Sequence, residues 1–290
     1  MGATAGDLLA ARTVGAWLDA AGIAHDVAVS EALADHVPDG VRWDDVPADG
    51  YTDVAVVCGP VGDAPPLTDL LTRFAGARRW ALDVTMLQRR DEWDPFDAWW
   101  ARDGDPAVEP RPDLALAAPG EPAPVVALVL AHDQQEYAER RHAEVHAVVR
   151  SVLSDADVAV VEVDTCFDPA NATGLRTAAQ VEGVLRAVDV VVTTRLHGLV
   201  LGLRNGTPVL AVDPVAGGAK VAAQAEALGW PEVLRPEEVD VASVRAALQR
   251  MLAGERDADI ERCRRHGLAR IEQVRAEVLD ALAAEVVAGG

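Results

Sequence analysis

The chain has 290 residues and a formal net charge of -21. A surface this acidic repels phosphate backbones and anionic lipids, so we expect no binding to nucleic acid. No apolar run approaches the ~20 residues that a membrane helix needs, and the first residues lack the basic start and apolar core of a signal peptide. We therefore expect no membrane insertion and a cytoplasmic location.

Short β-branched runs alternate with helical patterns through the first part of the chain, which is typical of βα units with a parallel sheet. The predicted helices cover 7–22, 67–76 and 94–102, and the predicted strands cover 53–59, 79–85 and 112–117. The segment APGEPAP (118–124) then brings three prolines and a glycine together, which favours a linker. We place the domain boundary there, which gives domains 1–118 and 119–290.

The same alternation restarts after the linker and is clearer. Strands are predicted over 125–131, 157–163, 189–194 and 207–213, and helices over 133–154, 177–188, 195–206, 218–228, 240–254 and 256–286. The sequence therefore predicts an α/β protein with two doubly wound, Rossmann-type domains. Ligands of such sheets lie beyond the carboxyl ends of the strands, and in paired domains they lie in the cleft between them.

The most informative segment is DVVVTTRLHGLVLGLRNGTPVLAVD (189–213), where a buried strand passes at once into a helix. Free amide groups and the helix dipole at such a corner favour an anion. Arg195 adds a planar, permanently charged group that suits carboxylate or phosphate, and His197 adds a side chain able to transfer protons near neutral pH. The alternative is that Arg195 bonds a neighbouring carbonyl and His197 is a core histidine.

This segment resembles the polysaccharide pyruvyl transferase family over about 176–231, with T-R-L-H-G, N-G-T-P-V-L-A-V and a lysine in the following loop. The resemblance implies a GT-B-like fold of two Rossmann-type domains facing a cleft, with the acceptor side in 1–118 and the donor side in 119–290. It implies a pyruvyl transferase that moves the pyruvyl group of phosphoenolpyruvate onto a sugar diol, as a cyclic ketal, in polysaccharide or glycoconjugate biosynthesis. The acceptor would be a sugar, a nucleotide-sugar or a lipid-linked glycan. Neither a metal nor a cofactor is implied.

The resemblance also nominates site residues. Arg195 and His197 would be catalytic, and Arg195, Lys220 and Arg90 would bind the donor. Lys220 follows Gly217 and Gly218 at a strand-to-helix turn, a favourable place for a charge aimed at phosphate, although a solvated lysine is the alternative. Arg90 lies in a charged run, and only the resemblance of Arg90-Asp91 to an Arg-Asp pair of the family distinguishes it from a solvated arginine.

Two departures from the family pattern keep other functions open. The strand expected before the opening loop is missing, and the loop after DVAVVCG (53–59) is poor in glycine. The alternatives are a nucleotide-sugar glycosyltransferase or epimerase of the same architecture, or a non-catalytic member of the family. Among the remaining candidates, we interpret His142 and His146 as a solvated helix face. The three scattered cysteines favour neither a disulfide framework nor a zinc site.

Overall fold

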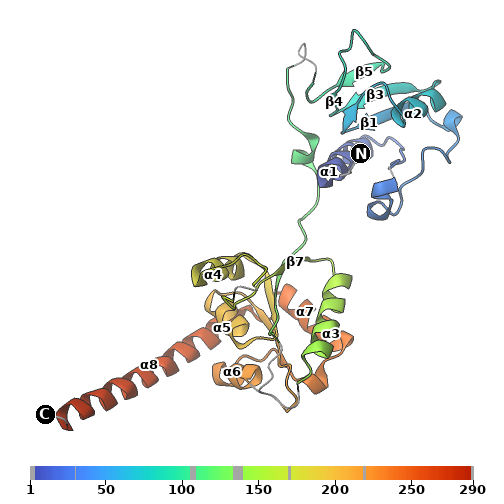
Figure 1. Cartoon of the computed structure of the whole chain (residues 1–290). Helices are drawn as coiled ribbons and strands as arrows, with labels where there is room; N and C mark the ends of the chain where they lie inside the picture. Colours follow the sequence, from blue (N-terminus) through green and yellow to red (C-terminus); the bar gives the residue numbers. More distant parts are fainter. Residues whose placement is uncertain are drawn as a thin grey trace. The chain divides into compact units, whose positions relative to one another are not determined.

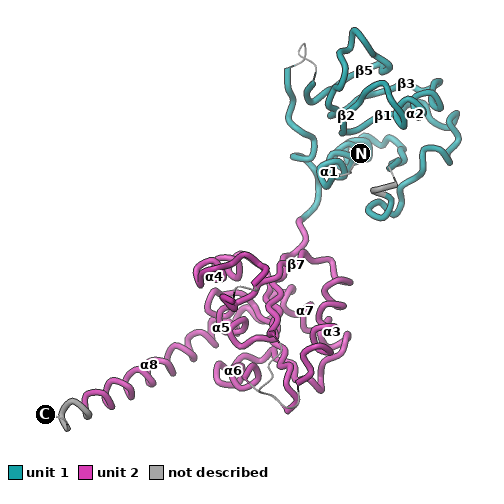
Figure 2. Tube along the Cα trace, in the orientation of Figure 1, with its two compact units in different colours: residues 1–121 teal, residues 122–290 magenta. Residues whose placement is uncertain are grey.

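The computed structural model describes residues 4–29, 31–104, 109–132, 140–168, 171–217 and 220–288. It divides into two compact units, unit 1 (Met1–Glu121) and unit 2 (Pro122–Gly290), which Figure 2 shows in different colours. The division falls inside the Pro-rich segment 118–124. Both units are α/β with parallel strands, so the predicted fold class is confirmed.

Unit 1 is built on a three-stranded parallel sheet in the order β1-β3-β5. Its elements are α1 (Ala5–Ala20), β1 (Asp53–Val57), β2 (Pro60–Val61), α2 (Leu67–Arg73), β3 (Arg78–Leu82), β4 (Thr85–Met86), β5 (Ala98–Trp100) and three short 3-10 helices, Glu31–His36, Ala48–Gly50 and Leu114–Ala117. The side chain of Thr4 accepts the amide of Asp7 and the carboxylate of Asp7 accepts the amide of Thr4, so a capping box starts α1. The buried core is small and centres on Leu71, Ala81 and Met86.

Strand β1 is an edge strand. Among the described strands it pairs only with β3, and none of its five residues is buried. The amide of Cys58 donates to the carbonyl of Leu82, and the carbonyl of Thr52 accepts the amide of Arg78, so these two groups face β3. Because backbone groups alternate along a strand, the N–H and C=O groups of Asp53, Ala55 and Val57 face the other edge. That edge has no neighbouring strand in the part of the chain that the structure describes.

Two predicted elements of unit 1 are wrong. The predicted helix over 94–102 is instead β5, which pairs with β3 and brings Trp100 into a stack with Trp80, with ring centroids 5.5 Å apart. Aromatic side chains favour strands because they pack well across a pleated surface. The predicted strand over 112–117 is a 3-10 helix, because the side chain of Asp113 accepts the amide of Ala115 and turns the chain there.

Unit 2 holds a five-stranded parallel sheet in the order β10-β9-β8-β6-β7. The strands are β6 (Val125–Val129), β7 (Ala159–Glu162), β8 (Val190–Thr193), β9 (Val209–Val212) and β10 (Val233–Leu234), and the helices are α3 (His142–Asp155), α4 (Ala178–Ala187), α5 (Leu196–Arg204), α6 (Lys220–Leu228), a 3-10 helix Pro236–Glu238, α7 (Val241–Leu252) and α8 (Asp257–Ala288). Helices α3 and α7 pack together, and α4, α5 and α6 form a second layer (Figure 1). Every residue of β8 and β9 is buried between these layers.

The order of the strands creates a switch point in this sheet. The chain passes from β6 to β7 on one side and then returns to β8 on the other side of β6. The connections that leave the carboxyl ends of β6 and β8 therefore diverge. Open α/β sheets bind their ligands in the crevice between two such connections. Residues 133–139, the first part of the helix predicted over 133–154, are outside the described residues.

Helix α8 leaves the body of unit 2. Its first turns pack against α5 and α6 and bury Ile260, Cys263 and Gly267. From residue 268 to residue 283 every residue is exposed. Figure 1 shows this outer part projecting from unit 2 as a long straight rod.

Candidate functional site

The corner between β8 and α5 is fixed by Thr193. Its hydroxyl donates to the carbonyl of Val129 and its oxygen accepts the amide of Arg195, both at 2.9 Å. A Cβ atom on Gly198 would overlap the Thr193 side chain, so only glycine allows α5 to start this close to the strand. The T-R-L-H-G sequence therefore specifies a tight corner at the carboxyl edge of the sheet, with Arg195 as the N-cap residue of α5.

Arg195 reaches across the switch point to Asp164, which follows β7. Its Nη1 atom lies 3.3 Å from Oδ1 of Asp164, and the exposed fractions of the two side chains are 23% and 13%. A guanidinium has five N–H donors, so this contact leaves most of its capacity for a ligand. The hydroxyl of the neighbouring Thr165 is buried and has no hydrogen-bond partner among the described residues. The edge thus offers both a cation and a polar oxygen that is not yet bonded.

His132 is a site residue that the sequence analysis missed. It follows β6, and its Nε2 atom lies 2.9 Å from Oδ2 of Asp164, while the ring remains exposed. The amide of Cys166 donates to Oδ1 of the same carboxylate. A carboxylate that orients an exposed imidazole is a common arrangement for a general base or acid. The available signal was position, because His132 directly follows the strand predicted at 125–131.

His146 also belongs to this edge, which overturns its interpretation as part of a solvated helix face. Its Nε2 atom lies 3.0 Å from Oγ1 of Thr194, and that oxygen accepts the amide of Ala131. Burial, helped by the neighbouring His142 and Arg150, lowers the pKa of His146 to about 4. The ring is therefore neutral at physiological pH and positions Thr194 through a hydrogen bond rather than through charge. His142 is also buried.

His197 and Lys220 lie at the same edge of the sheet but are exposed. His197 is in the first turn of α5, after β8, and Lys220 is the first residue of α6, after the neighbouring strand β9. The buried Asp213 carboxylate accepts the amides of Val215 and Ala222, at 3.1 and 2.9 Å, and so fixes the connection from β9 to α6. Arg195, His197 and Lys220 are thus brought to one edge of unit 2.

Arg90 lies in unit 1 and is not placed relative to those three residues. Its Nη2 atom lies 2.9 Å from Oδ2 of Asp94, and its guanidinium lies 5.3 Å from the centroid of the Trp99 ring. Both partners come from the segment that follows Arg90. These contacts give Arg90 a local role, and its role in donor binding stays a prediction.

A second Arg-Asp pair, Arg102-Asp103, lies at the carboxyl edge of the sheet in unit 1. Arg102 follows β5 and donates to the Asp113 carboxylate at 2.5 Å and to the Thr85 hydroxyl at 2.9 Å. Burial raises the pKa of Asp83, which sits beside this cluster after β3 with a φ of 57°. The edge of unit 1 therefore carries its own charged network, centred on Arg102 and not on Arg90.

Cys58, after β1, borders the same network. Burial and the neighbouring Asp7 raise the pKa of its thiol to about 11. The thiol is therefore protonated at neutral pH and is a poor nucleophile. The other cysteines, Cys166 and Cys263, are also free.

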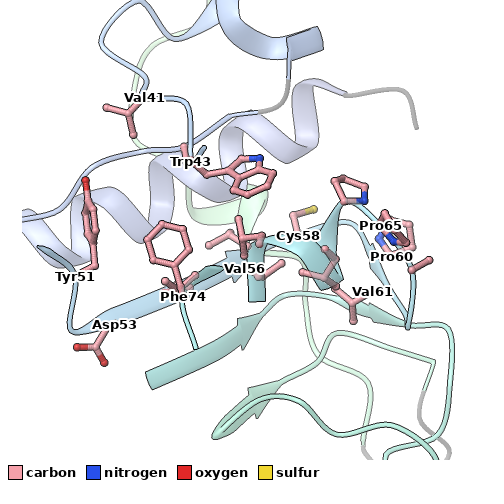
Figure 3. A pocket seen from close by; sticks show the side chains of 18 of the residues that line it. Val41, Trp43, Tyr51, Asp53, Val56, Cys58, Pro60, Val61, Pro65 and Phe74 are labelled. Atoms are coloured by element: carbon pink, nitrogen blue, oxygen red, sulfur yellow. The ribbon is translucent and has the colours of Figure 1, made fainter. Parts of the chain in front are cut away.

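Unit 1 also contains an apolar cavity of about 420 Å³ beside β1. Figure 3 shows Trp43, Val56 and Phe74 around it, with Tyr51 at one side. The Tyr51 hydroxyl donates to the Asp26 carboxylate at 2.6 Å. None of the predicted site residues lines this cavity. Cys58 lines the cavity and also borders the Arg102 network, so the cavity adjoins the charged edge of unit 1 at this residue.

No cluster of metal ligands occurs among the described residues, and no described helix is long and apolar enough to cross a membrane. A reaction without a metal stays a prediction.

Comparison with known proteins identifies the segment that carries this corner. Residues 105–214 match the family model described as polysaccharide pyruvyl transferase. The match includes β6, β8 and the Arg195 corner, and it confirms the resemblance for this part of the chain, which is less than half of it. The matched family is a transferase family. No curated protein matches the chain.

Several solved structures of glycosyltransferases are similar over much of the chain. The calicheamicin glycosyltransferase CalG4 is 20% identical, with 89% of this chain and 65% of that chain covered and a TM-score of 0.37. The glycotransferase of kitacinnamycin is 22% identical, with 68% of this chain and 54% of that chain covered and a TM-score of 0.32. The spinosyn forosaminyltransferase SpnP is 15% identical, with 94% of this chain and 97% of that chain covered and a TM-score of 0.36. The chain thus spans less than two thirds of the length of the first two.

Proposed function

We propose that the chain is a pyruvyl transferase that uses phosphoenolpyruvate to form a cyclic pyruvyl ketal on a sugar diol. The observation that carries the proposal is the Arg195 corner, which places a cation at the switch point of a sheet inside the matched segment. In a molecule of net charge -21, a small trianionic donor needs such a local concentration of positive charge. Preorganised cations are also what stabilises charge developing on the departing phosphate.

In this proposal Arg195 and Lys220 hold the carboxylate and phosphate of the donor, with Arg90 as a further donor-binding group. Asp164 bonds one N–H of Arg195, which fixes the direction of the guanidinium without occupying its other donors. The buried hydroxyl of Thr165 is a further group that can bond a donor oxygen. The donor is a substrate, and the proposal includes no metal and no resident cofactor.

The chemistry then needs proton transfer in two steps. A first sugar hydroxyl adds to C2 of the donor as C3 takes up a proton and becomes a methyl group, and the hydroxyl proton is released. A second hydroxyl then attacks C2, the C2–O bond to phosphate breaks, and the departing phosphate takes up a proton. His197 takes the proton from the acceptor hydroxyl or supplies the proton to C3. His132, oriented by Asp164, is the second group placed for the complementary transfer.

The acceptor is a sugar, free or carried on a nucleotide or a lipid, in a pathway of polysaccharide or glycoconjugate biosynthesis. Unit 2 is the donor side and unit 1 the acceptor side in this proposal. A cytoplasmic location is part of the same proposal, because phosphoenolpyruvate and nucleotide-sugars are intracellular metabolites.

The direct test incubates the purified chain with phosphoenolpyruvate and a set of sugar diols and follows phosphate release together with the gain of a pyruvyl group by mass. Arg195→Ala and His197→Ala should abolish turnover, and Lys220→Ala should mainly raise KM for the donor. Arg204→Ala is the matched control, because Arg204 is exposed in the last turn of the same helix. Full turnover in both the Arg195 and His197 variants would contradict the proposal.

Thermal shift separates this function from the alternatives. Stabilisation by phosphoenolpyruvate, lost in Arg195→Ala, is the expected result. Stabilisation by a nucleoside diphosphate without any effect of phosphoenolpyruvate would favour a glycosyltransferase or an epimerase. Stabilisation by phosphoenolpyruvate without turnover on any acceptor would favour a non-catalytic member of the family. His132→Asn, compared with His197→Asn in the pH profile of kcat, assigns the two proton transfers.

A further inference from the structure

The backbone pairing of β6 with β8 ends just before the site at the switch point. Thr194 directly follows β8, and its amide donates to the carbonyl of Val129 at 3.1 Å. If the parallel ladder continued, the carbonyl of Thr194 would accept the next amide on the β6 side, that of Ala131. The chain instead turns into α5, and the side-chain oxygen of Thr194 accepts this amide at 2.9 Å. The side chain thus extends the pairing beyond the ends of both strands.

The bond between Thr194 and Ala131 joins the two segments that carry the charged and titratable groups of the site. Ala131 immediately precedes His132, and Thr194 immediately precedes Arg195. His132 and Arg195 contact the same carboxylate, that of Asp164, through Oδ2 at 2.9 Å and through Oδ1 at 3.3 Å. The bond therefore fixes the spacing of the two segments from which the imidazole and the guanidinium reach this carboxylate.

The Thr194 hydroxyl is buried, with 1% of the residue exposed, so its own proton also needs an acceptor. The described group in reach is Nε2 of His146, at 3.0 Å. Burial keeps this ring neutral at physiological pH, which leaves one ring nitrogen able to accept. The hydroxyl therefore accepts from Ala131 and donates to His146. A serine at this position would keep both bonds, whereas a valine would keep the shape of the side chain and lose both.

The position of His132 decides which of its ring atoms can react. A carboxylate only accepts hydrogen bonds, so the contact with Asp164 places the proton of the neutral imidazole on Nε2. Nδ1 is then the atom left to exchange a proton with a substrate, and the His132 side chain is 57% exposed. Proton transfer requires the two heavy atoms to lie within about 3 Å of each other. A displacement of about 1 Å can slow such a reaction roughly a hundredfold.

We propose that Thr194 is a positioning residue, whose side chain keeps the His132 imidazole at a fixed place relative to the Arg195 guanidinium. Its effect on turnover rests on the proposed function, whereas its effect on the position of His132 does not. The corner itself is fixed by Thr193, which accepts the amide of Arg195. Loss of the Thr194 hydroxyl should therefore displace His132 and leave Arg195 in place. The kinetic signature is a lower kcat at an unchanged KM for phosphoenolpyruvate.

Two measurements on the full chain test the position of His132 without any need for turnover. In Thr194→Val the amide of Ala131 should exchange its hydrogen at least about tenfold faster, because it has lost its acceptor. At about pH 9, the ¹⁵N signals of the His132 ring should shift toward a mixture of the two neutral tautomers. Thr194→Ser should retain the slow exchange and the single tautomer. A ring spectrum of His132 that is unchanged in Thr194→Val overturns the proposal.

Thr207→Val is the matched control. Thr207 is another buried threonine of unit 2, and its hydroxyl donates to the carbonyl of Leu185 at 2.7 Å, but it precedes β9 and so lies at the opposite edge of the sheet. With phosphoenolpyruvate, Thr194→Val should lower kcat at least about tenfold and change KM less than about twofold. Thr194→Ser should restore kcat, and Thr207→Val should leave it unchanged.

Equal losses of kcat in Thr194→Val and Thr207→Val overturn the proposal, because they would reflect the loss of a buried hydrogen bond anywhere in unit 2. The absence of turnover in the unmodified chain contradicts the proposed function instead. In that case the hydrogen exchange and the ring spectrum of His132 still decide whether Thr194 positions the imidazole.

Discussion

The sequence Asp-Val-Ala-Val-Val occurs once in each unit, at 53–57 and at 157–161, and the closely similar Asp-Val-Val-Val-Thr occurs at 189–193. The first forms β1 and the second leads into β7, and both are edge strands with exposed or half-buried residues. The third forms β8, in which every residue is buried. The same kind of apolar run thus contributes little or much to the core according to its neighbours in the sheet.

This difference extends to the units as a whole. Unit 2 has helices packed on its central strands and a continuous core, whereas unit 1 has three strands in its main sheet and a small core. Small sheets bury less apolar surface per residue, so they depend more on individual polar contacts. We therefore expect packing to dominate the stability of unit 2 and the Arg102 network to dominate that of unit 1. Four predictions test this contrast, from the largest expected effect to the smallest.

Gly198→Ala should have the largest effect, a loss of about 3 kcal/mol in the free energy of unfolding of unit 2. The added Cβ overlaps the Thr193 side chain, so α5 must move away from β8. Amide hydrogen exchange in β8 and β9 measures the loss. Gly183→Ala is the control, because that helical position has open space and should gain up to about 1 kcal/mol. Equal effects of the two substitutions would show that the corner is not tightly packed.

Arg102→Met should destabilise unit 1 by about 2 kcal/mol and leave unit 2 unchanged. It removes the hydrogen bonds to Asp113 and Thr85 and leaves the carboxylates of that network without a cation. Tryptophan fluorescence in urea reports on unit 1, since six of the seven tryptophans belong to it. Arg78→Met, at an exposed ion pair, should cost less than about 1 kcal/mol. Equal losses in the free energy of unfolding for the two variants would show that the Arg102 network stabilises unit 1 no more than an exposed ion pair does.

Truncation of one valine in each type of strand measures the contrast between centre and edge. Val192→Ala, in the buried β8, should lower the free energy of unfolding by about 2 kcal/mol. Val56→Ala in β1 and Val160→Ala in β7 should each cost less than about 1 kcal/mol, because both side chains are already partly in contact with water. Chemical denaturation followed by circular dichroism gives the three values. A large cost for Val56→Ala would mean that something in solution covers the free edge of β1.

At neutral pH His146→Gln should have the smallest effect of the four, and its consequence should appear as a change in the pH dependence of stability. The pKa of His146 is about 4 in the folded chain, against about 6.5 for an exposed histidine. The unfolded chain therefore binds a proton between these values that the folded chain does not. This contribution to stability is complete above pH 6.5 and is lost as the pH falls toward 4.

The variant should accordingly lose less stability than the parent between pH 6.5 and pH 4, by on the order of 2 kcal/mol. Urea midpoints at several pH values measure the difference. His266→Gln is the control, because His266 is exposed on α8 and should leave the pH dependence unchanged. Parallel pH profiles for His146→Gln and the parent would show that the ring is not buried in solution.

The order of elements in unit 2 could be predicted, except for the two-residue strand β10, because each longer strand is a compact apolar run followed by a clear helical pattern. The Arg195 corner could be predicted for the same reason, since a strand passes there directly into a helix. His132 could not, because its role depends on Asp164 and therefore on β6 lying beside β7. The burial of His146 likewise depends on where α3 packs, and not on the local pattern of its residues.

In unit 1 the dipeptide Arg-Asp occurs at 90–91 and again at 102–103. The resemblance to the family nominates the first pair, whereas the structure places the second in the charged network at the carboxyl edge of the sheet. The contact between Arg102 and Asp113 links two segments whose separation in the sequence carries no periodic signal. Contacts of this kind become visible only once the neighbouring strands are known.

The open edge of β1 has a consequence for the way the chain is made. Unit 1 leaves the ribosome before unit 2. Its strand β1 emerges with apolar residues and with backbone groups along one edge that are able to pair with another strand. An unpaired edge of this kind favours pairing between neighbouring nascent chains until the unit has folded. Slow synthesis at low temperature should therefore raise the yield of well-folded protein.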